Sequence, residues 1–178
     1  MSRTSTIRVL HTLGPAGTNC EQAARHWLGG PERGGKVVLY ETLERAVDAM
    51  PYDVGHALLG CVVYPELHTL VFSNLRRLEL VECFVYPTYN MVLASRTGQM
   101  PRSVVSHPAP VELIPTSVGA RLLANSNAQA AIDCAAGRAE GCITTIVAAR
   151  EKGLVVVEDY GPVPMGFSIH APKFEARP

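Results

Sequence analysis

Residues 7–19 read Ile-Arg-Val-Leu-His-Thr-Leu-Gly-Pro-Ala-Gly-Thr-Asn, and this stretch decides the fold. Its first part is a short apolar run that predicts a strand ending at Leu13. Glycine and proline follow at once and end the strand, and Thr18 or Asn19 can cap the helix that we expect over residues 20–28. A strand that passes through a glycine-containing turn into a helix is the opening unit of an α/β fold.

The same alternation continues along the first half of the chain. Residues 37–40 predict a second strand, and apolar residues recur at helical spacing from Leu43 to Met50. The continuous apolar run from His56 to Val63 is typical of a strand that is buried on both faces. Strands and helices that alternate over short links predict a parallel sheet with right-handed crossovers.

The rest of the chain completes the first group near residue 83, and predicts a second α/β group over about residues 88–157 and a final strand after Pro162. We expect strands over residues 78–84, 89–94, 104–105, 141–145, 154–157 and 167–169, and helices over residues 128–135 and 146–152. Residues 111–123 are expected to be partly helical, with an interruption at Pro115. The chain therefore predicts a two-lobed α/β fold with a ligand cleft between the lobes. Residues 1–83 and 162–178 would form the first lobe, and residues 84–161 the second.

The charge pattern excludes several classes of partner. The chain has 16 basic and 16 acidic side chains spread along its 178 residues, so no stretch offers a nucleic-acid footprint or a polybasic membrane patch. No apolar run approaches the roughly 18 residues of a membrane span. Residues 1–7 lack the apolar core of a signal peptide. We expect a cytoplasmic protein that binds neither nucleic acid nor membranes.

Cysteine and glycine spacings give no sign of a metal or a cofactor. The five cysteines contain no Cys-x-x-Cys pair, and no two histidines lie four residues apart. The glycines at 14 and 17 lack the full G-x-G-x-x-G spacing of a dinucleotide site, and no P-loop motif is present. We expect reduced thiols that pack as small apolar groups, no metal and no cofactor.

Polar residues gather where four predicted strands end, which is where open parallel sheets bind ligands. A small carboxylate is the ligand that exposed helix N–H groups and hydroxyls suit. Each junction also has a plainer interpretation, because serine, threonine and asparagine before a helix are commonly N-caps. The residues that we expect in the site are Gly17, Thr18, Asn19, Ser106, His107, Pro108, Ser126, Asn127, Thr144 and Thr145.

Four motifs in the right order resemble the prephenate dehydratase family. LGPAGT at 13–18 with the following EQAA is similar to the family's opening GPxGT[FS]SExAA pattern, and VVSHP at 104–108 to its mid-chain SHP segment. Residues 126–131 match its S-x-A-x-A-A element, and residues 141–154 its A-A-I-A-S…A-A…G-L block. The resemblance implies two lobes like those of type II periplasmic binding proteins. We expect no regulatory ACT domain within these 178 residues.

Two departures from the family pattern bear on the reaction. Residues 59–64 read Leu-Gly-Cys-Val-Val-Tyr where a dehydratase carries V-P-I-E-N-S. Residues 165–167 read Met-Gly-Phe where it carries Thr-Arg-Phe. In the family that threonine is thought to assist loss of the ring hydroxyl, and the arginine to hold a substrate carboxylate. Neither functional group is present here.

One branch with the same departures is that of the non-aromatising prephenate decarboxylases, of the bacilysin-pathway type. The chain resembles it at residues 11–18, 105–110 and 164–165. The resemblance implies a lyase of antibiotic metabolism that decarboxylates prephenate or a related cyclic dienyl carboxylate. His107, Thr145 and Asn19 are candidate proton donors, and Met165 would join the remaining site residues in binding substrate.

Three other functions stay open. They are a tailoring enzyme of tropolone pathways, a true prephenate dehydratase, and a non-catalytic binder of a shikimate-derived acid. The resemblance also implies self-association, as a homodimer or a homotetramer.

Overall fold

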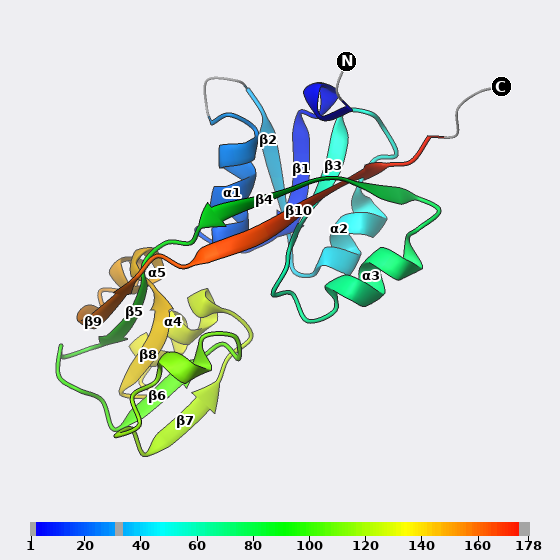
Figure 1. Cartoon of the computed structure of the whole chain (residues 1–178). Helices are drawn as coiled ribbons and strands as arrows, with labels where there is room; N and C mark the ends of the chain where they lie inside the picture. Colours follow the sequence, from blue (N-terminus) through cyan, green and yellow to red (C-terminus); the bar gives the residue numbers. More distant parts are fainter. Residues whose placement is uncertain (1–2, 31–33, 175–178) are drawn as a thin grey trace. The chain divides into compact units, whose positions relative to one another are not determined.

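The computed structural model describes residues 3–30 and 34–174, and the predicted loop over residues 29–36 lies partly outside them. The chain divides into two compact units, which are described separately. The first comprises Met1–Tyr86 and Pro164–Pro178, and the second comprises Pro87–Val163. Each unit is built on a five-stranded sheet (Figure 1). No helix of the described part is long and apolar enough to cross a membrane.

The sheet of the first unit has the strand order β2-β1-β3-β10-β4. Its strands are β1 (Val9–Leu13), β2 (Lys36–Tyr40), β3 (His56–Cys61), β4 (Leu78–Pro87) and β10 (Pro164–Pro172). β1 pairs in parallel with both β2 and β3, as the alternating sequence pattern predicts. β10 returns from the end of the chain and pairs antiparallel with β3, from Phe167 opposite Cys61 to His170 opposite Leu58.

Helices cover both faces of this sheet. The helical elements of the unit are η1 (Arg3–Thr6), α1 (Asn19–Trp27), α2 (Leu43–Ala49) and α3 (Leu67–Ser73). One core cluster joins Cys20, Ala23 and Ala24 of α1 to the sheet, and another joins α2 and α3 to Leu58. Because β3 is buried between these two layers, its sequence is a continuous apolar run.

The sheet of the second unit has the order β7-β6-β8-β5-β9. Its strands are β5 (Met91–Ser95), β6 (Ser103–Ser106), β7 (Ala120–Leu123), β8 (Gly141–Thr145) and β9 (Val155–Gly161). β6 is parallel to β7 and β8, whereas β5 is antiparallel to β8 and β9. The remaining elements are η3 (Val111–Leu113), α4 (Asn127–Ala135) and α5 (Ile146–Glu151).

Two local expectations are corrected by the structure. The prediction of a partly helical stretch over residues 111–123 is wrong beyond the short turn η3, because Ala120–Leu123 is strand β7. β7 lies at the edge of its sheet with mostly exposed side chains, so its sequence carries no strand periodicity. Helix α3 was not predicted, because it is only seven residues long and Leu70 alone among them is buried.

Candidate active site

The first group of predicted site residues lies where β1 ends. The Gly14 N–H donates to the Tyr40 carbonyl at 2.7 Å, which ties the following loop to the end of β2. The Gly14–Pro15 peptide is cis, and Gly17 has a φ of +81°, a conformation that favours glycine. This loop leads directly to Asn19, the first residue of α1.

The polar groups of this loop already have partners within the protein. The Thr18 hydroxyl accepts the Glu21 N–H at 3.4 Å and donates to the Leu13 carbonyl at 3.3 Å. The Gly17 N–H donates to the Glu21 carboxylate at 2.7 Å, and the Arg25 guanidinium pairs with the same carboxylate at 2.7 Å. Thr18 is therefore the N-cap of α1, and a substrate carboxylate would compete with Glu21 for the Gly17 N–H.

Gly166 lies directly against Val62, at the same end of the sheet, where β1 and β3 finish. The Val62 N–H donates to the Gly166 carbonyl at 3.1 Å. A Cβ added at Gly166 would lie 3.0 and 3.1 Å from the two methyl carbons of Val62, so any side chain there requires Val62 to move. The two departures from the dehydratase pattern, at residues 59–64 and 165–167, are therefore parts of one packing arrangement. The half-buried Met165 beside them packs against the core on the α1 face of the sheet.

The second group lies where the parallel strands of the second unit end. The Ala124 N–H, just after β7, donates to the Ser106 carbonyl at the end of β6 at 2.9 Å. The Thr144 hydroxyl on β8 donates to the Asn127 carbonyl at 2.6 Å. The structure thus brings Ser106, Ser126, Asn127 and Thr144 to the end of this sheet where β6 and β8 finish, as their positions after predicted strands imply.

The hydroxyls of the second group also have partners within the unit. Ser106 is fully buried and donates to the His107 carbonyl at 2.8 Å. Ser126 and Thr145 are the N-caps of α4 and α5, and their hydroxyls accept backbone N–H groups at 3.0 and 3.2 Å. The Asn127 side-chain oxygen is different, since it is buried without a hydrogen-bond partner among the described residues. An acceptor in that position costs free energy until a donor reaches it.

His107 is held as a neutral imidazole. Its Nδ1 accepts the Ala109 N–H at 3.2 Å, which leaves Nε2 to carry the ring proton. Burial lowers the pKa of His107. At neutral pH the ring can therefore donate a hydrogen bond from Nε2, but it is a poor source of an acidic proton. The neighbouring Pro108 is exposed.

A buried histidine network inside the first unit was missed by the sequence interpretation. His11 on β1 is only 3% exposed, and its Nε2 lies 2.9 Å from Nδ1 of His56. Its Nδ1 lies 2.8 Å from the Tyr40 hydroxyl. Burial, with smaller contributions from His56 and Lys36, lowers the pKa of His11 to about 4. The available signal was a histidine inside a mostly apolar strand.

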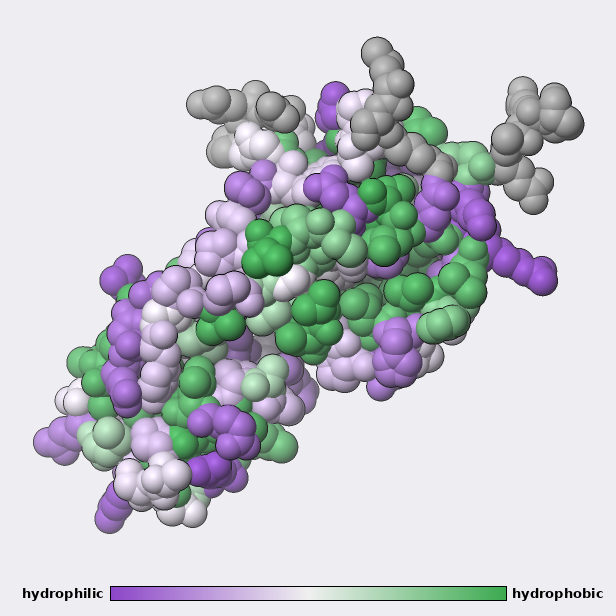
Figure 2. Space-filling model, viewed as in Figure 1, coloured by the Kyte–Doolittle hydropathy of each residue, from purple (hydrophilic) through white to green (hydrophobic). Residues whose placement is uncertain are grey.

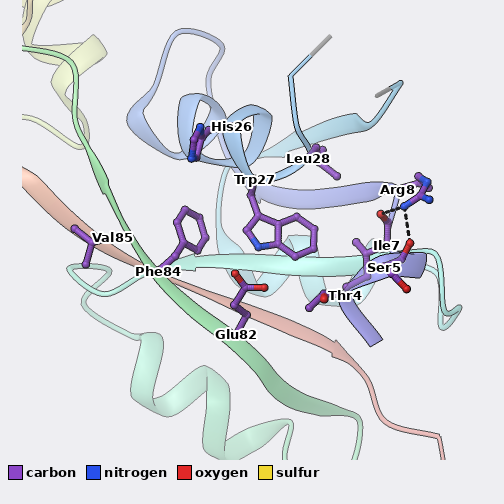
Figure 3. A pocket seen from close by; sticks show the side chains of 10 residues that line it. All are labelled: Thr4, Ser5, Ile7, Arg8, His26, Trp27, Leu28, Glu82, Phe84 and Val85. Carbon is purple, nitrogen blue, oxygen red and sulfur yellow. Dashed lines mark hydrogen bonds between the residues drawn. The ribbon is translucent and has the colours of Figure 1, made fainter. Parts of the chain in front are cut away.

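The described residues contain no group of three His, Cys, Asp or Glu side chains placed to hold a metal ion. A cavity of about 700 Å³ lies in the first unit, at the end where β1 begins (Figure 3). It is lined by η1, the residues before β1, the last turn of α1 and part of β4, including Arg8, Trp27, Glu82 and Phe84. Because the predicted site residues lie where the strands end, this cavity is separate from them.

Comparison with known proteins gives a relative in sequence. No family model matches the chain. It is 29% identical to the prephenate decarboxylase of Bacillus subtilis strain 168, over 93% of this chain and 87% of that protein. The resemblance that the motifs predicted is confirmed by this match.

Solved structures give the fold. The prephenate dehydratase of Arthrobacter aurescens, in complex with L-Phe, matches with a TM-score of 0.69 and 16% identity, over 93% of this chain. That of Staphylococcus aureus Mu50 matches with a TM-score of 0.66 and 14% identity, over 91% of this chain. The chain spans 61% and 65% of the lengths of these two proteins. The predicted prephenate dehydratase type of α/β fold is confirmed.

Proposed function

We propose that this chain is a carbon–carbon lyase that decarboxylates prephenate, or a related cyclic dienyl carboxylate, without making the ring aromatic. The similarity to the Bacillus prephenate decarboxylase over 93% of the chain carries this proposal. The packing of Gly166 against Val62 supports it, because no arginine fits there without a rearrangement. Antibiotic biosynthesis and a cytoplasmic location are part of the proposal, and a biosynthetic gene cluster next to the gene would support the first of them.

The lack of a proton donor at position 165 suits a reaction that retains the ring hydroxyl. A dehydratase must protonate the ring hydroxyl so that it leaves as water. A decarboxylase that retains the hydroxyl breaks only the bond between the ring and its carboxylate. The electron pair shifts through the diene, and a distal ring carbon takes a proton. The Met165 thioether cannot protonate a hydroxyl, whereas threonine could hydrogen-bond to it.

We propose that backbone N–H groups and helix ends, more than free hydroxyls, position the substrate. The hydroxyls of Thr18, Ser126 and Thr145 already accept backbone N–H groups, so their main effect is to fix the first turns of their helices. Such turns present the unpaired N–H groups that bind carboxylates. We assign His107 the role of an orienting donor through Nε2, because its lowered pKa disfavours an imidazolium acid.

A second candidate function is a non-catalytic binder of a shikimate-derived acid. The same capping bonds favour it, because they commit the hydroxyls of Thr18, Ser126 and Thr145 and leave His107 as the one acid–base side chain among the predicted site residues. Incubation of the purified protein with prephenate distinguishes the possibilities by product. A non-aromatic dihydro-hydroxyphenylpyruvate indicates the decarboxylase, and phenylpyruvate indicates a dehydratase. Unchanged prephenate with saturable binding indicates the binder. In a parallel incubation with a seven-membered ring acid, turnover of that acid alone indicates a tropolone-type enzyme.

Self-association is also part of the proposal. Apolar side chains gather on the viewed face of the first unit (Figure 2), and Phe72, Leu80 and Val85 are 72%, 56% and 70% exposed. β4 carries two of them along the edge of its sheet, where an edge strand can pair with a second copy. Light scattering with a Leu80→Lys, Val85→Lys variant tests this, and an unchanged mass for the variant would refute the role of β4.

A further inference from the structure

Four of the five cysteines lie in two buried pairs, although the sequence separates the members of each pair. Cys20 in the first turn of α1 and Cys61 at the end of β3 are buried in one core cluster, where their thiols interact with each other. Cys134 on α4 and Cys142 on β8 form the equivalent contact in the second unit. All five cysteines are free thiols. The spacing rules that argue against disulfides in the sequence do not detect such pairs, because the fold creates them.

The two pairs differ in access. Cys20 and Cys61 are 8% and 6% exposed, whereas Cys134 and Cys142 are both 0% exposed. A small solute can therefore reach the first pair through minor fluctuations, but reaching the second requires the unit to open.

Each pair has one thiol whose surroundings stabilise a thiolate. The interaction with the Cys20 thiol and the nearby Val63 N–H lower the pKa of Cys61 despite its burial, and the same interaction together with burial raises the pKa of Cys20. In the second unit, Cys142 and the positive charge of Arg96 lower the pKa of Cys134, although its sulfur lies 3.6 Å from the Glu140 carbonyl, an acceptor that favours a protonated thiol. Cys20 lies at the positive end of the α1 dipole, whereas Cys134 lies in the last turn of α4, at the negative end. Cys61 is thus the nucleophile of the more accessible pair, with Cys20 as its partner.

We propose that Cys20 and Cys61 form an oxidisable dithiol, which a small peroxide converts into a disulfide between the first turn of α1 and the end of β3. The Cys61 thiolate attacks one peroxide oxygen, the O–O bond breaks, and the leaving hydroxide takes a proton to become water. The Cys61 sulfenic acid that results is then attacked by Cys20. An S–S bond forms, the S–O bond breaks, and a second water leaves with the Cys20 proton. Two thiols and one hydrogen peroxide thereby give one disulfide and two waters.

The position of this pair connects it to the proposed active site. Cys20 follows Thr18 and Asn19 directly, and Cys61 pairs in the sheet with Phe167, two residues from Met165. The two sulfurs must approach to about 2 Å to form the bond, so the disulfide shifts α1 against β3. An effect on prephenate turnover rests on the proposed function, whereas formation of the disulfide does not.

The test uses the full chain in a Cys83→Ser background, because Cys83 is exposed and would form bonds between molecules. The protein is treated with hydrogen peroxide, its remaining thiols are blocked, and its intact mass and disulfide-linked peptides are measured. We expect the loss of two hydrogens, a single Cys20–Cys61 linkage, and reversal by dithiothreitol. Adding Cys61→Ser should abolish the linkage, whereas adding Cys134→Ser should leave it unchanged.

Three results would overturn the proposal. They are four free thiols after treatment, a linkage between Cys134 and Cys142, and over-oxidation of Cys61 without a linkage. If the linkage forms and prephenate is never turned over, the dithiol proposal stands and the proposed function fails. If prephenate is turned over and no linkage forms, the proposed function stands and the dithiol proposal fails.

Discussion

Val62 fills the space over Gly166, where a Cβ would lie 3.0 Å from one methyl carbon of Val62 and 3.1 Å from the other. The backbone N–H of Val62 also donates to the carbonyl of Gly166 at 3.1 Å. The two segments that depart from the dehydratase pattern therefore contact each other, although about a hundred residues separate them in the sequence. A substitution in one segment therefore limits which side chains fit in the other.

Gly166→Arg should therefore destabilise the protein by about 1–3 kcal/mol, because the new side chain overpacks against Val62. Denaturant unfolding measures the loss. In the double variant with Val62→Ala the cost should fall by at least about 0.5 kcal/mol relative to the sum of the single variants. Strictly additive effects would show that the contact between the two residues carries no energetic coupling.

Met165→Thr should give the protein some dehydratase activity. The threonine hydroxyl restores a donor beside the ring hydroxyl that must leave. Phenylpyruvate, followed by its ultraviolet absorbance, should appear with Met165→Thr and increase when Val62→Ala and Gly166→Arg are added. Met165→Val is the matched control, since it has nearly the shape of threonine without the hydroxyl. Equal phenylpyruvate from the two variants would remove Met165 from this role.

Ser126→Ala should separate capping from substrate binding. Loss of the α4 cap should cost about 1 kcal/mol of the free energy of unfolding. Thr42→Ala is the control, because Thr42 caps α2 in the same way through the Arg45 N–H at 3.2 Å and belongs to no predicted site. If Ser126 also positions substrate, only Ser126→Ala should raise KM for prephenate. Equal loss of stability with no change of KM in either variant would leave Ser126 as a plain cap.

His11 should make the first unit sensitive to acid. Its pKa falls from 6.5 to about 4 in the folded protein, so folding favours the neutral ring. The stability that this provides is present above pH 6.5, the unfolded value, and is lost as the pH falls towards 4. It amounts to about 3 kcal/mol in total.

Unfolding of wild type and His11→Phe, measured between pH 7 and pH 4, tests this expectation. The variant should lose less stability over that range, with the exposed His68→Gln as control. His107 and His170 also have lowered pKa values and contribute in the same direction. We therefore expect the free energy of unfolding of His11→Phe to fall less steeply as the pH falls, but still to fall. An unchanged slope in His11→Phe would show that His11 does not titrate in this way.

The sequence predicts the α/β architecture well, for a physical reason. β3 is buried between two helix layers, so its residues after His56 are apolar throughout, and α1 and α2 carry apolar stripes at helical spacing. β7 and α3 were not predicted, because their local sequence patterns are weak. β7 is stabilised by its pairing with β6, and α3 by its packing on the core of the first unit. The cleft predicted between the lobes stays a prediction.

The site could be predicted only in part. The capping residues Thr18, Ser126 and Thr145 are visible in the sequence, because each precedes a helix. The pairing of Cys20 with Cys61 and of Val62 with Gly166 is not, because each joins segments that only the sheet brings together. Residue types alone do not report such contacts.

The fate of two labels in prephenate tests the central claim most directly. The substrate carries heavy carbon in its ring carboxylate and heavy oxygen in its ring hydroxyl, and the purified protein is followed by NMR and mass spectrometry. A non-aromatising decarboxylase releases the carbon label as carbon dioxide and keeps the oxygen label in a non-aromatic product. Release of the oxygen label into water, or retention of both labels in unchanged prephenate, would contradict the account.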